Sequence, residues 1–404
     1  GVGGGSAQFY AGIIGGAFVC FLWGVVGASA QRISSWYAPN PIGQIDSLHR
    51  AVQSLPAGRE KAEALNNLGY ALRFRNSQQA LGYARQALRI ADSLNLPLEQ
   101  ASAWRVYGFY YRIANRYDSA LAYFHRAFRR AQELNEQEIV ADLANDIGNA
   151  YRAQGENDSA LAWLRGALER YRSMKNVRGE ADALFNLGLL YRRQGRYDRT
   201  AELYRQARAL SSKFSDPMFE TQIYYGIGDV YLNMARLDDN PAVLRKAVEH
   251  FREALAAQKA FGNDEGMGQS DFGMGQAFKY MHQYDSALRY YDSALVMSVS
   301  KQMAHIELNV LWSIGHLHEE AGRRKDAEWR YRQQYSRAMR VDRPDQATSA
   351  LSGIERLFQL ERRYDSAEVW YLRAFEIAKR INDRQYQATM LYNLANLDIE
   401  CQRW

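Results

Sequence analysis

The chain of 404 residues is poor in the residues that build several large protein classes. It has only 7 prolines and 2 cysteines, so the sequence excludes a collagen-like chain and a scaffold held together by disulfides. Its 51 Lys and Arg nearly balance its 45 Asp and Glu, which leaves a formal net charge of +6. This balance gives no reason to expect a nucleic-acid partner. With 47% hydrophobic residues and 27 tyrosines, the chain has the composition of a folded protein.

The sequence motifs of common active sites are absent or incomplete. There is no Gly-x-Ser-x-Gly, no phosphate loop ending in Gly-Lys-Ser/Thr and no closely spaced cysteine pair. Residues 318–322, His-Glu-Glu-Ala-Gly, have glycine where a zinc-protease helix needs its second histidine. We therefore expect no catalytic residue, no metal and no other cofactor. Four histidines could form a metal site only through folding, and we interpret them as surface or packing residues: His282, His305, His316 and His318.

The first thirty residues differ from the rest of the chain. Residues 9–30 carry no formal charge, and the apolar run 13–23 is followed by the small residues Gly-Ala-Ser-Ala at 27–30. An apolar segment ending in Ala-x-Ala predicts a signal peptide cleaved before Gln31. A retained membrane anchor is the alternative, because about 20 apolar residues can span a bilayer. We expect an exported protein, periplasmic or otherwise extracytoplasmic, or one anchored in the membrane through residues 9–30 if these are not cleaved.

Beyond residue 56 the sequence repeats itself. An apolar or aromatic residue followed by glycine recurs at intervals of 39, 40, 40, 40, 47 and 40 residues. Small residues recur twelve and nineteen positions after most of these glycines, and an aromatic residue or leucine lies between them. Such a period indicates an array of similar structural units. The repeated glycines are Gly69, Gly108, Gly148, Gly188, Gly228, Gly275 and Gly315.

Each unit has the pattern of a hairpin of two antiparallel helices. A glycine inside a helix costs about 1 kcal/mol relative to alanine, so we interpret the repeated glycine as the place where two helices approach closely. Gly155, Gly195 and Gly322 are placed to end first helices of the pairs. Aspartates are placed to cap the second helices: Asp118, Asp158, Asp198, Asp285 and Asp365.

One segment carries a family resemblance. Residues 180–198 read Glu-Ala-Asp-Ala-Leu-Phe-Asn-Leu-Gly-Leu-Leu-Tyr-Arg-Arg-Gln-Gly-Arg-Tyr-Asp, and Ala201, Tyr204 and Ala207 follow. This segment resembles a tetratricopeptide repeat almost position for position. The resemblance extends over residues 57–404, although the period of 40 exceeds the common period of about 34. It implies an all-α fold, an α-α superhelix of about eight helical hairpins.

The sequence divides into three parts on this interpretation. Residues 1–30 form the signal peptide or anchor, residues 31–56 a linker and an N-terminal capping helix, and residues 57–404 the repeat array. Repeat arrays need a cap at each end. The final helix, from Gln385 to about residue 400, has neither a partner nor a polar face, so we expect the array to continue beyond Trp404.

Two units depart from the period. The interval of 47 residues contains an insertion at 237–243, where Asn240 can cap and Pro241 can begin a longer second helix. In the eighth unit the glycine position falls on Glu355, which fits close helix contact poorly. Either this hairpin is splayed or Gly353 takes the role of the glycine in a shifted register.

The resemblance implies that function lies in the concave groove lined by the first helix of each pair. Positions three before, one after and four after each glycine should point into it. In the N-terminal half these positions are rich in Arg and Asn, and in the C-terminal half they are aromatic. The predicted peptide-binding residues are Arg73, Arg105, Arg112, Asn145, Asn149, Arg152, Arg192, Phe185, Tyr225, Phe272 and Trp312.

This distribution suggests that an acidic part of a peptide lies over the arginines and an apolar part over the aromatic rings. The alternative is that the arginines are solvated helix formers that pair with carboxylates such as Asp142 and Asp182. Lysines form the dicarboxylate clamp of some members of the family. Because only Lys279 lies in this groove, we do not expect that specificity.

Three classes of function follow. The first is a non-catalytic interaction scaffold that binds a peptide or protein segment in its groove, and we favour it. The second is the exported sensory region of a larger signalling protein, with a histidine kinase, cyclase or DNA-binding output outside this chain. The third is an enzyme with a site at the histidines. Nucleic-acid binding is disfavoured by the 45 acidic residues.

Overall fold

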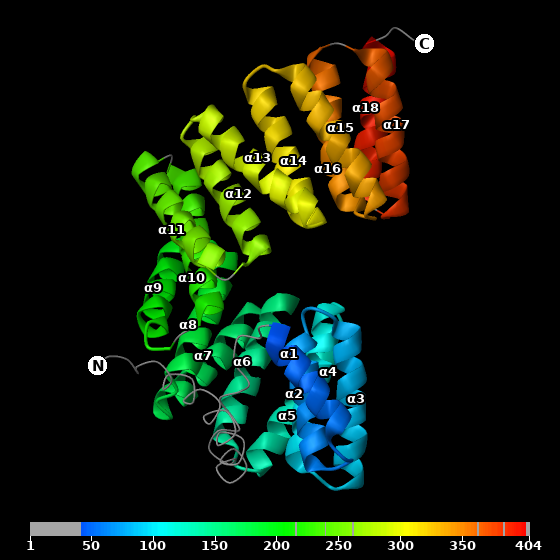
Figure 1. The fold of residues 1–404 in the computed structure, drawn as a ribbon. Coiled ribbons are helices and arrows are strands. Elements are labelled where there is room, and N and C mark those ends of the chain that lie inside the picture. The colour runs from blue at the N-terminus through cyan, green and yellow to red at the C-terminus, as the bar shows by residue number, and fades with distance from the viewer. Residues whose placement is uncertain are drawn as a thin grey trace, which may run out of the picture. The chain divides into compact units, whose positions relative to one another are not determined.

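The computed structural model describes residues 42–400 apart from Ser215, Asp239, Phe261, Arg362 and Asp383. Over these residues the chain forms eighteen helices and no strand (Figure 1). They follow the predicted order of one initial helix, eight pairs and one final helix, which confirms the all-α repeat fold. No helix in this part of the chain is long and apolar enough to cross a membrane. The predicted signal peptide or anchor lies outside the described residues.

The chain divides into two compact units between Leu190 and Tyr191. The helices up to this division are α1 (Ile42–Ser54), α2 (Arg59–Leu72), α3 (Ser77–Ser93), α4 (Pro97–Ile113), α5 (Tyr117–Glu133), α6 (Gln137–Gln154), α7 (Asn157–Ser173) and α8 (Val177–Arg193), of which α8 crosses it. The later helices are α9 (Tyr197–Ser211), α10 (Pro217–Asp238), α11 (Pro241–Ala260), α12 (Asp264–Tyr280), α13 (Tyr284–Ser300), α14 (Ala304–Glu320), α15 (Arg324–Arg340), α16 (Pro344–Leu360), α17 (Tyr364–Arg380) and α18 (Arg384–Glu400).

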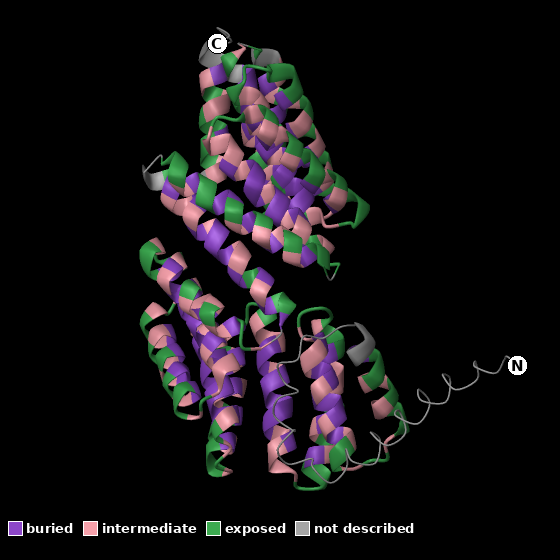
Figure 2. Ribbon diagram, turned by 60° about the vertical axis from the view of Figure 1, so that its left-hand side comes forward, coloured by how far each residue is buried: buried purple, intermediate pink, exposed green. Residues whose placement is uncertain are grey.

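Within each unit, consecutive helices pack as hairpins and the first helices of neighbouring hairpins also contact each other. The pairs α2 and α4, α10 and α12, α12 and α14, and α14 and α16 lie side by side in this way. These first helices form what we call the first-helix face, and α3, α5, α11, α13, α15 and α17 form the second-helix face. Buried residues lie where helices of one unit meet, and exposed residues gather at the turns (Figure 2).

The repeated glycines admit aromatic rings between the helices. A Cβ atom added to Gly315 of α14 would lie 2.7 Å from the ring of Tyr331 on α15. The other edge of the same ring meets Gly353 of α16, where an added Cβ atom would again lie 2.7 Å away. The phenyl ring of Phe251 sits in the same manner between Gly228 and Gly273. The tyrosine and phenylalanine columns of the sequence therefore form the core that joins successive hairpins.

The eighth hairpin keeps the register of the others. Gly353 and Gly273 lie two positions before the repeat position, and both pack against the ring of the preceding hairpin. Glu355 therefore occupies the repeat position itself and is buried, with 6% of its surface exposed. The shifted register considered for this unit is not needed.

The ends of the helices differ in part from the prediction. Gly155, Gly195 and Gly322 end first helices with positive φ angles of 99°, 72° and 73°, as expected. The predicted aspartate caps are wrong, because each N-cap lies two residues before the aspartate, at Arg116, Glu156, Arg196 and Gln283. The aspartates lie in the first turn instead, where they complement the positive end of the helix dipole: Asp118, Asp158, Asp198 and Asp285.

The insertion in the fifth unit lengthens both helices of the hairpin. Helix α10 has 22 residues and α11 has 20, against 17 in most others. Helix α11 begins at Pro241, and Oδ1 of Asn240 accepts a 3.0 Å hydrogen bond from the backbone N–H of Ala242. The predicted cap and start of this helix are confirmed.

Candidate functional site

Two arginines that form no ion pair within the described residues lie on the first-helix face of residues 42–190. The guanidinium of Arg73, the C-cap residue of α2, stands 3.7 Å from the ring centre of Tyr70, and that of Arg112 on α4 lies 5.6 Å from the ring centre of Phe109. Neither arginine has a carboxylate partner among the described residues. Burial lowers the pKa of Arg112; the carboxylate of Asp146 opposes this shift, and the neighbouring charge of Arg73 adds to it. Two half-buried cations held on aromatic rings are suited to an anionic group.

Arg105 lies beneath this surface, although the sequence predicted that it would contact a peptide. Its side chain is 2% exposed, and its Nε donates to Asp146 at 2.5 Å while its Nη1 donates to Asp142 at 3.1 Å. The hydroxyl of Tyr171 donates a further 2.7 Å hydrogen bond to Asp142. Burial raises the pKa of Asp146, and Arg105 opposes this shift. The network joins α4, α6 and α7 in the interior, so we leave Arg105 out of the proposed binding surface.

The predicted asparagines form a chain of amide hydrogen bonds. Asn145 is buried, and its Oδ1 accepts a 3.0 Å bond from Nδ2 of Asn186 on α8. Asn149 donates to the carbonyl of Asn145 at 3.1 Å and accepts two bonds from Arg152, at 3.1 and 3.2 Å. Asn149 and Arg152 are partly exposed, whereas Asn145 supports them from below. Phe185 is partly buried on α8.

Arg192 pairs with a carboxylate, which is the alternative to peptide binding considered for the arginines. Its Nη1 lies 2.5 Å from Oδ2 of Asp229 on α10. Burial lowers the pKa of Arg192, but the carboxylate of Asp229 outweighs this effect and the pKa is raised overall. Tyr225, on the same helix as Asp229, is largely buried, and this burial raises its pKa to about 12. The ring of Tyr225 packs 5.5 Å from that of Phe251 on α11, and Arg192 is already neutralised by Asp229.

A pocket of about 480 Å³ opens on the first-helix face of residues 191–400. It is lined by α12, α14 and α16, and it contains two predicted residues, Phe272 and Trp312. Uncharged amide and hydroxyl groups surround these rings: Gln276, Asn309, Ser313, Gln346, Ser349 and Ser352. An aromatic floor with uncharged hydrogen-bonding groups is suited to an apolar side chain and its neighbouring peptide bonds.

Sequence reasoning missed most of the polar residues of this pocket. Asn309 and Ser349 lie six positions before the repeat position, which the groove pattern did not count. Ser352 lies three positions before Glu355, at a counted position, but the register of the eighth unit was open. Gln276 lies one position after its glycine and was the one lining residue that the pattern could have added.

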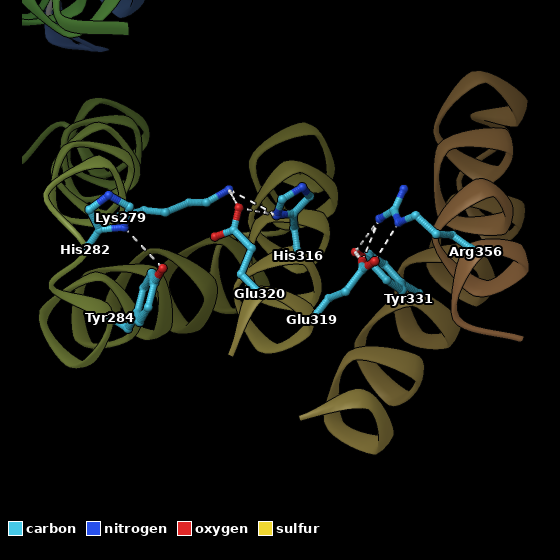
Figure 3. Close-up of polar contacts among 8 residues, drawn as sticks. All are labelled: Lys279, His282, Tyr284, His316, Glu319, Glu320, Tyr331 and Arg356. Carbon is cyan, nitrogen blue, oxygen red and sulfur yellow. Dashed lines mark hydrogen bonds and ion pairs between the residues drawn. The ribbon is translucent and has the colours of Figure 1, made fainter. Parts of the chain in front are cut away.

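Charged contacts tie the three helices together beside the pocket (Figure 3). The ammonium of Lys279 on α12 donates to Nδ1 of His316 at 3.1 Å and lies 3.3 Å from Glu320. Burial and the charge of Lys279 lower the pKa of His316, so its neutral ring accepts this bond. Glu319 of α14 accepts two bonds from Arg356 of α16, at 2.5 and 2.6 Å.

The contacts of Lys279 with Glu320 and of Arg356 with Glu319 neutralise the charges beside the pocket. Burial raises the pKa of Glu319, but the bonds from Arg356 and from the hydroxyl of Tyr331 outweigh burial and hold the pKa below its usual range. Arg356 also lines the pocket, so its pairing with Glu319 leaves the pocket close to uncharged. The contacts fix the spacing of α12, α14 and α16 on which the pocket depends.

The four histidines do not come together. His305 lies 3.4 Å from Glu265, and Nδ1 of His282 lies 3.2 Å from the hydroxyl of Tyr284. Burial lowers the pKa of His318. Across the described residues, no group of three His, Cys, Asp or Glu side chains could hold a metal ion.

Comparison with known proteins agrees with this architecture. Two family models of the tetratricopeptide repeat match residues 99–173 and 145–213. The helical hairpins define a repeat protein, and within residues 99–213 its repeats match the tetratricopeptide repeat, in agreement with the resemblance seen in the sequence. A search of curated proteins finds no match to the chain.

Solved structures share the fold at low sequence identity. A Rap protein complexed with Competence and Sporulation Factor is 13% identical, with a TM-score of 0.56, over 87% of this chain and 95% of that chain. NprR in complex with its cognate peptide NprX is 15% identical, with a TM-score of 0.51, over 76% and 86%. The human IFIT1 dimer with m7Gppp-AAAA is 14% identical, with a TM-score of 0.59, over 88% and 77%. Identities this low show the fold alone.

Proposed function

We propose that the protein is a non-catalytic interaction scaffold that binds a peptide or protein segment on its first-helix face. The pocket around Phe272 and Trp312 carries this proposal. Its volume of about 480 Å³ lies within the range of roughly 300–1,000 Å³ that is usual for ligand sites. An apolar side chain of the partner lies against the two rings, and Asn309 and Gln276 bond its peptide groups.

We further propose that the bound segment is acidic, and the arginines of residues 42–190 support this. Arg73 and Arg112 lie close enough for their charges to interact, and neither forms an ion pair with a carboxylate among the described residues. A carboxylate of the partner would reduce the repulsion between the two guanidinium groups. It would also accept hydrogen bonds from them in place of the water lost on burial.

The fold neighbours are consistent with a peptide partner. The Rap protein structure contains Competence and Sporulation Factor, and the NprR structure contains its cognate peptide NprX. An exported location, predicted from residues 1–30, would make the partner an extracytoplasmic protein.

Selection on a phage-displayed library of linear random peptides tests the proposal. The peptides enriched on the full chain are synthesised, and their affinity is measured by fluorescence anisotropy. Trp312→Ala should weaken binding roughly tenfold or more, because a buried aromatic anchor is removed. Trp329→Ala is the matched control, since this tryptophan is 54% exposed on α15 and does not line the pocket. The proposal fails if no peptide is enriched, or if all enriched peptides bind Trp312→Ala unchanged.

A further inference from the structure

A second groove, of about 360 Å³, lies between helices of the second-helix face. It is lined by α13 and α15, with α14 as its floor, and it contains none of the predicted site residues. Its apolar lining consists of Leu295 and Val299 on α13, Leu311 on α14 and Trp329 on α15. Leu311 is buried, whereas Val299 is 53% and Trp329 54% exposed. Two large apolar side chains thus face solvent beside a groove with an apolar floor, which is typical of an interaction surface.

The charged lining of this groove is strongly one-sided. Glu307 is the one carboxylate that lines it, against Arg330, Arg332, Arg337 and Arg340, all from α15. Nε of Arg337 lies 2.8 Å from Oε2 of Glu307, so this pair is internally neutralised at the floor. Arg332 is paired with Glu328 at 2.7 Å, so Arg330 and Arg340 leave the lining positive.

Two of these arginines lack a close anionic partner. Arg330 lies 3.9 Å from its nearest carboxylate, that of Asp292, and its buried Nε makes no hydrogen bond within the described chain. The guanidinium of Arg330 stands 4.5 Å from the ring centre of Trp329. Arg340 is exposed and contacts only the carbonyl of Ser336, at 3.4 Å, among the bonds of the described residues. Burial lowers the pKa of Arg330, as is expected for a cation without sufficient counter-charge.

We propose that this groove binds an acidic amphipathic helix of a partner protein. The apolar stripe of that helix lies along the groove on Leu295, Val299 and Trp329, and its flanking carboxylates meet Arg330 and Arg340. Two parallel ridges with an apolar floor match the way an amphipathic helix binds in a groove. Tryptophan and arginine are also the residue types that contribute most to such interfaces. The site is separate from the pocket of the proposed function, and it takes a helical rather than an extended segment.

The other anion that arginines and an exposed tryptophan could bind is a nucleic acid. The pairing of the charges argues against it, because Glu307 occupies Arg337 and Glu328 occupies Arg332, so the groove does not offer the run of free cations that a phosphate backbone needs. The groove therefore offers two separate cationic points beside an apolar stripe, which fits a helix with few, spaced carboxylates.

The test uses the full chain and a phage-displayed library of amphipathic helical peptides. The apolar stripe is fixed, and each flanking position is randomised between Glu and Lys, so the selected charge is itself a result. We expect enrichment of Glu at these positions. The enriched peptides should bind Trp329→Ala and Arg330→Ala roughly tenfold or more weakly. They should bind Trp312→Ala, which alters the other pocket, with unchanged affinity.

A charge exchange separates a specific contact from loss of folding. Arg340→Glu should weaken the acidic peptide and should strengthen a peptide in which one flanking Glu is replaced by Lys. Arg340 is exposed, so circular dichroism of this variant should match the wild type. Enrichment of Lys, no enrichment, or equal affinity for Trp329→Ala and wild type would overturn the proposal. So would displacement of the peptide by a single-stranded oligonucleotide that binds more tightly and also requires Trp329.

Discussion

Glu355 should make the stability of the eighth hairpin depend on pH. This carboxyl group is 6% exposed at a position where the earlier hairpins have glycine, and its Oε1 has no hydrogen-bond partner within the described residues. Burial raises its pKa from 4.5 to about 8. Removing the charge with Glu355→Gln keeps the shape of the side chain and eliminates the titration.

The direction and size follow from the two pKa values. Below about pH 4.5 the carboxyl is neutral in the folded and unfolded states, and its contribution to stability is complete. As the pH rises toward 8, the unfolded chain loses this proton and the folded chain keeps it, so the free energy of unfolding falls by about 1.4 kcal/mol per pH unit. The loss is about 3 kcal/mol at pH 7 and levels off near 5 kcal/mol above pH 8.

Hydrogen exchange measured by mass spectrometry on α16 and α17 between pH 5 and 8 follows this effect locally. After correction for the intrinsic exchange rate, protection in the wild type should fall across this interval relative to Glu355→Gln. The two proteins should differ by about 3 kcal/mol at pH 7 and by less than 1 kcal/mol at pH 5. Glu376→Gln, at an exposed position on α17, is the control. Parallel pH profiles for wild type and Glu355→Gln would refute the reasoning.

Three further predictions concern the interior and the arginines. Arg105→Met should destabilise the protein by about 3–5 kcal/mol in urea unfolding, because it leaves Asp142 and Asp146 buried without their cation; an unchanged midpoint would contradict the role of this network. Gly315→Ala should cost about 1–3 kcal/mol in the same assay, because its Cβ would overlap the ring of Tyr331, and Gly82→Ala, which meets no atom within 4 Å, is the control. Replacing both Arg73 and Arg112 by Glu should weaken acidic selected peptides roughly tenfold or more and leave neutral ones unchanged, as anisotropy would show; equal losses for both kinds of peptide would count against an acidic partner.

The fold could be predicted from the sequence because its determinants recur. The glycine at one position and the aromatic ring at another are two sides of one contact, as the Gly315 and Tyr331 pair shows. Repetition at a fixed period makes such a pair visible without any knowledge of tertiary structure. The aspartate caps could not be predicted in the same way. The residue before each aspartate begins the helix, a tyrosine in most units and Asn157 in α7, and a shift of two residues at a helix end leaves the repeat pattern unchanged.

The binding surface was harder to predict, because equivalent positions need not have equivalent burial. Arg105 and Trp312 lie at the same place in their repeats, yet Arg105 is buried by the two aspartates of the next hairpin, while Trp312 lines an open pocket. Only the presence of Asp142 and Asp146, four residues apart on the next first helix, could have indicated that difference. The groove around Trp329 could not be predicted in this way, since the pattern of predicted binding positions considered first helices alone.

Photo-crosslinking tests most directly the central claim that a peptide binds in the pocket around Phe272 and Trp312. A photoreactive group is placed in turn along a peptide selected on the full chain, and the crosslinked residues are identified by mass spectrometry. The account predicts crosslinks to α12, α14 and α16 around Asn309, Trp312 and Ser349, and their loss in Trp312→Ala. Crosslinks distributed over other helices, or retained in Trp312→Ala, would contradict it.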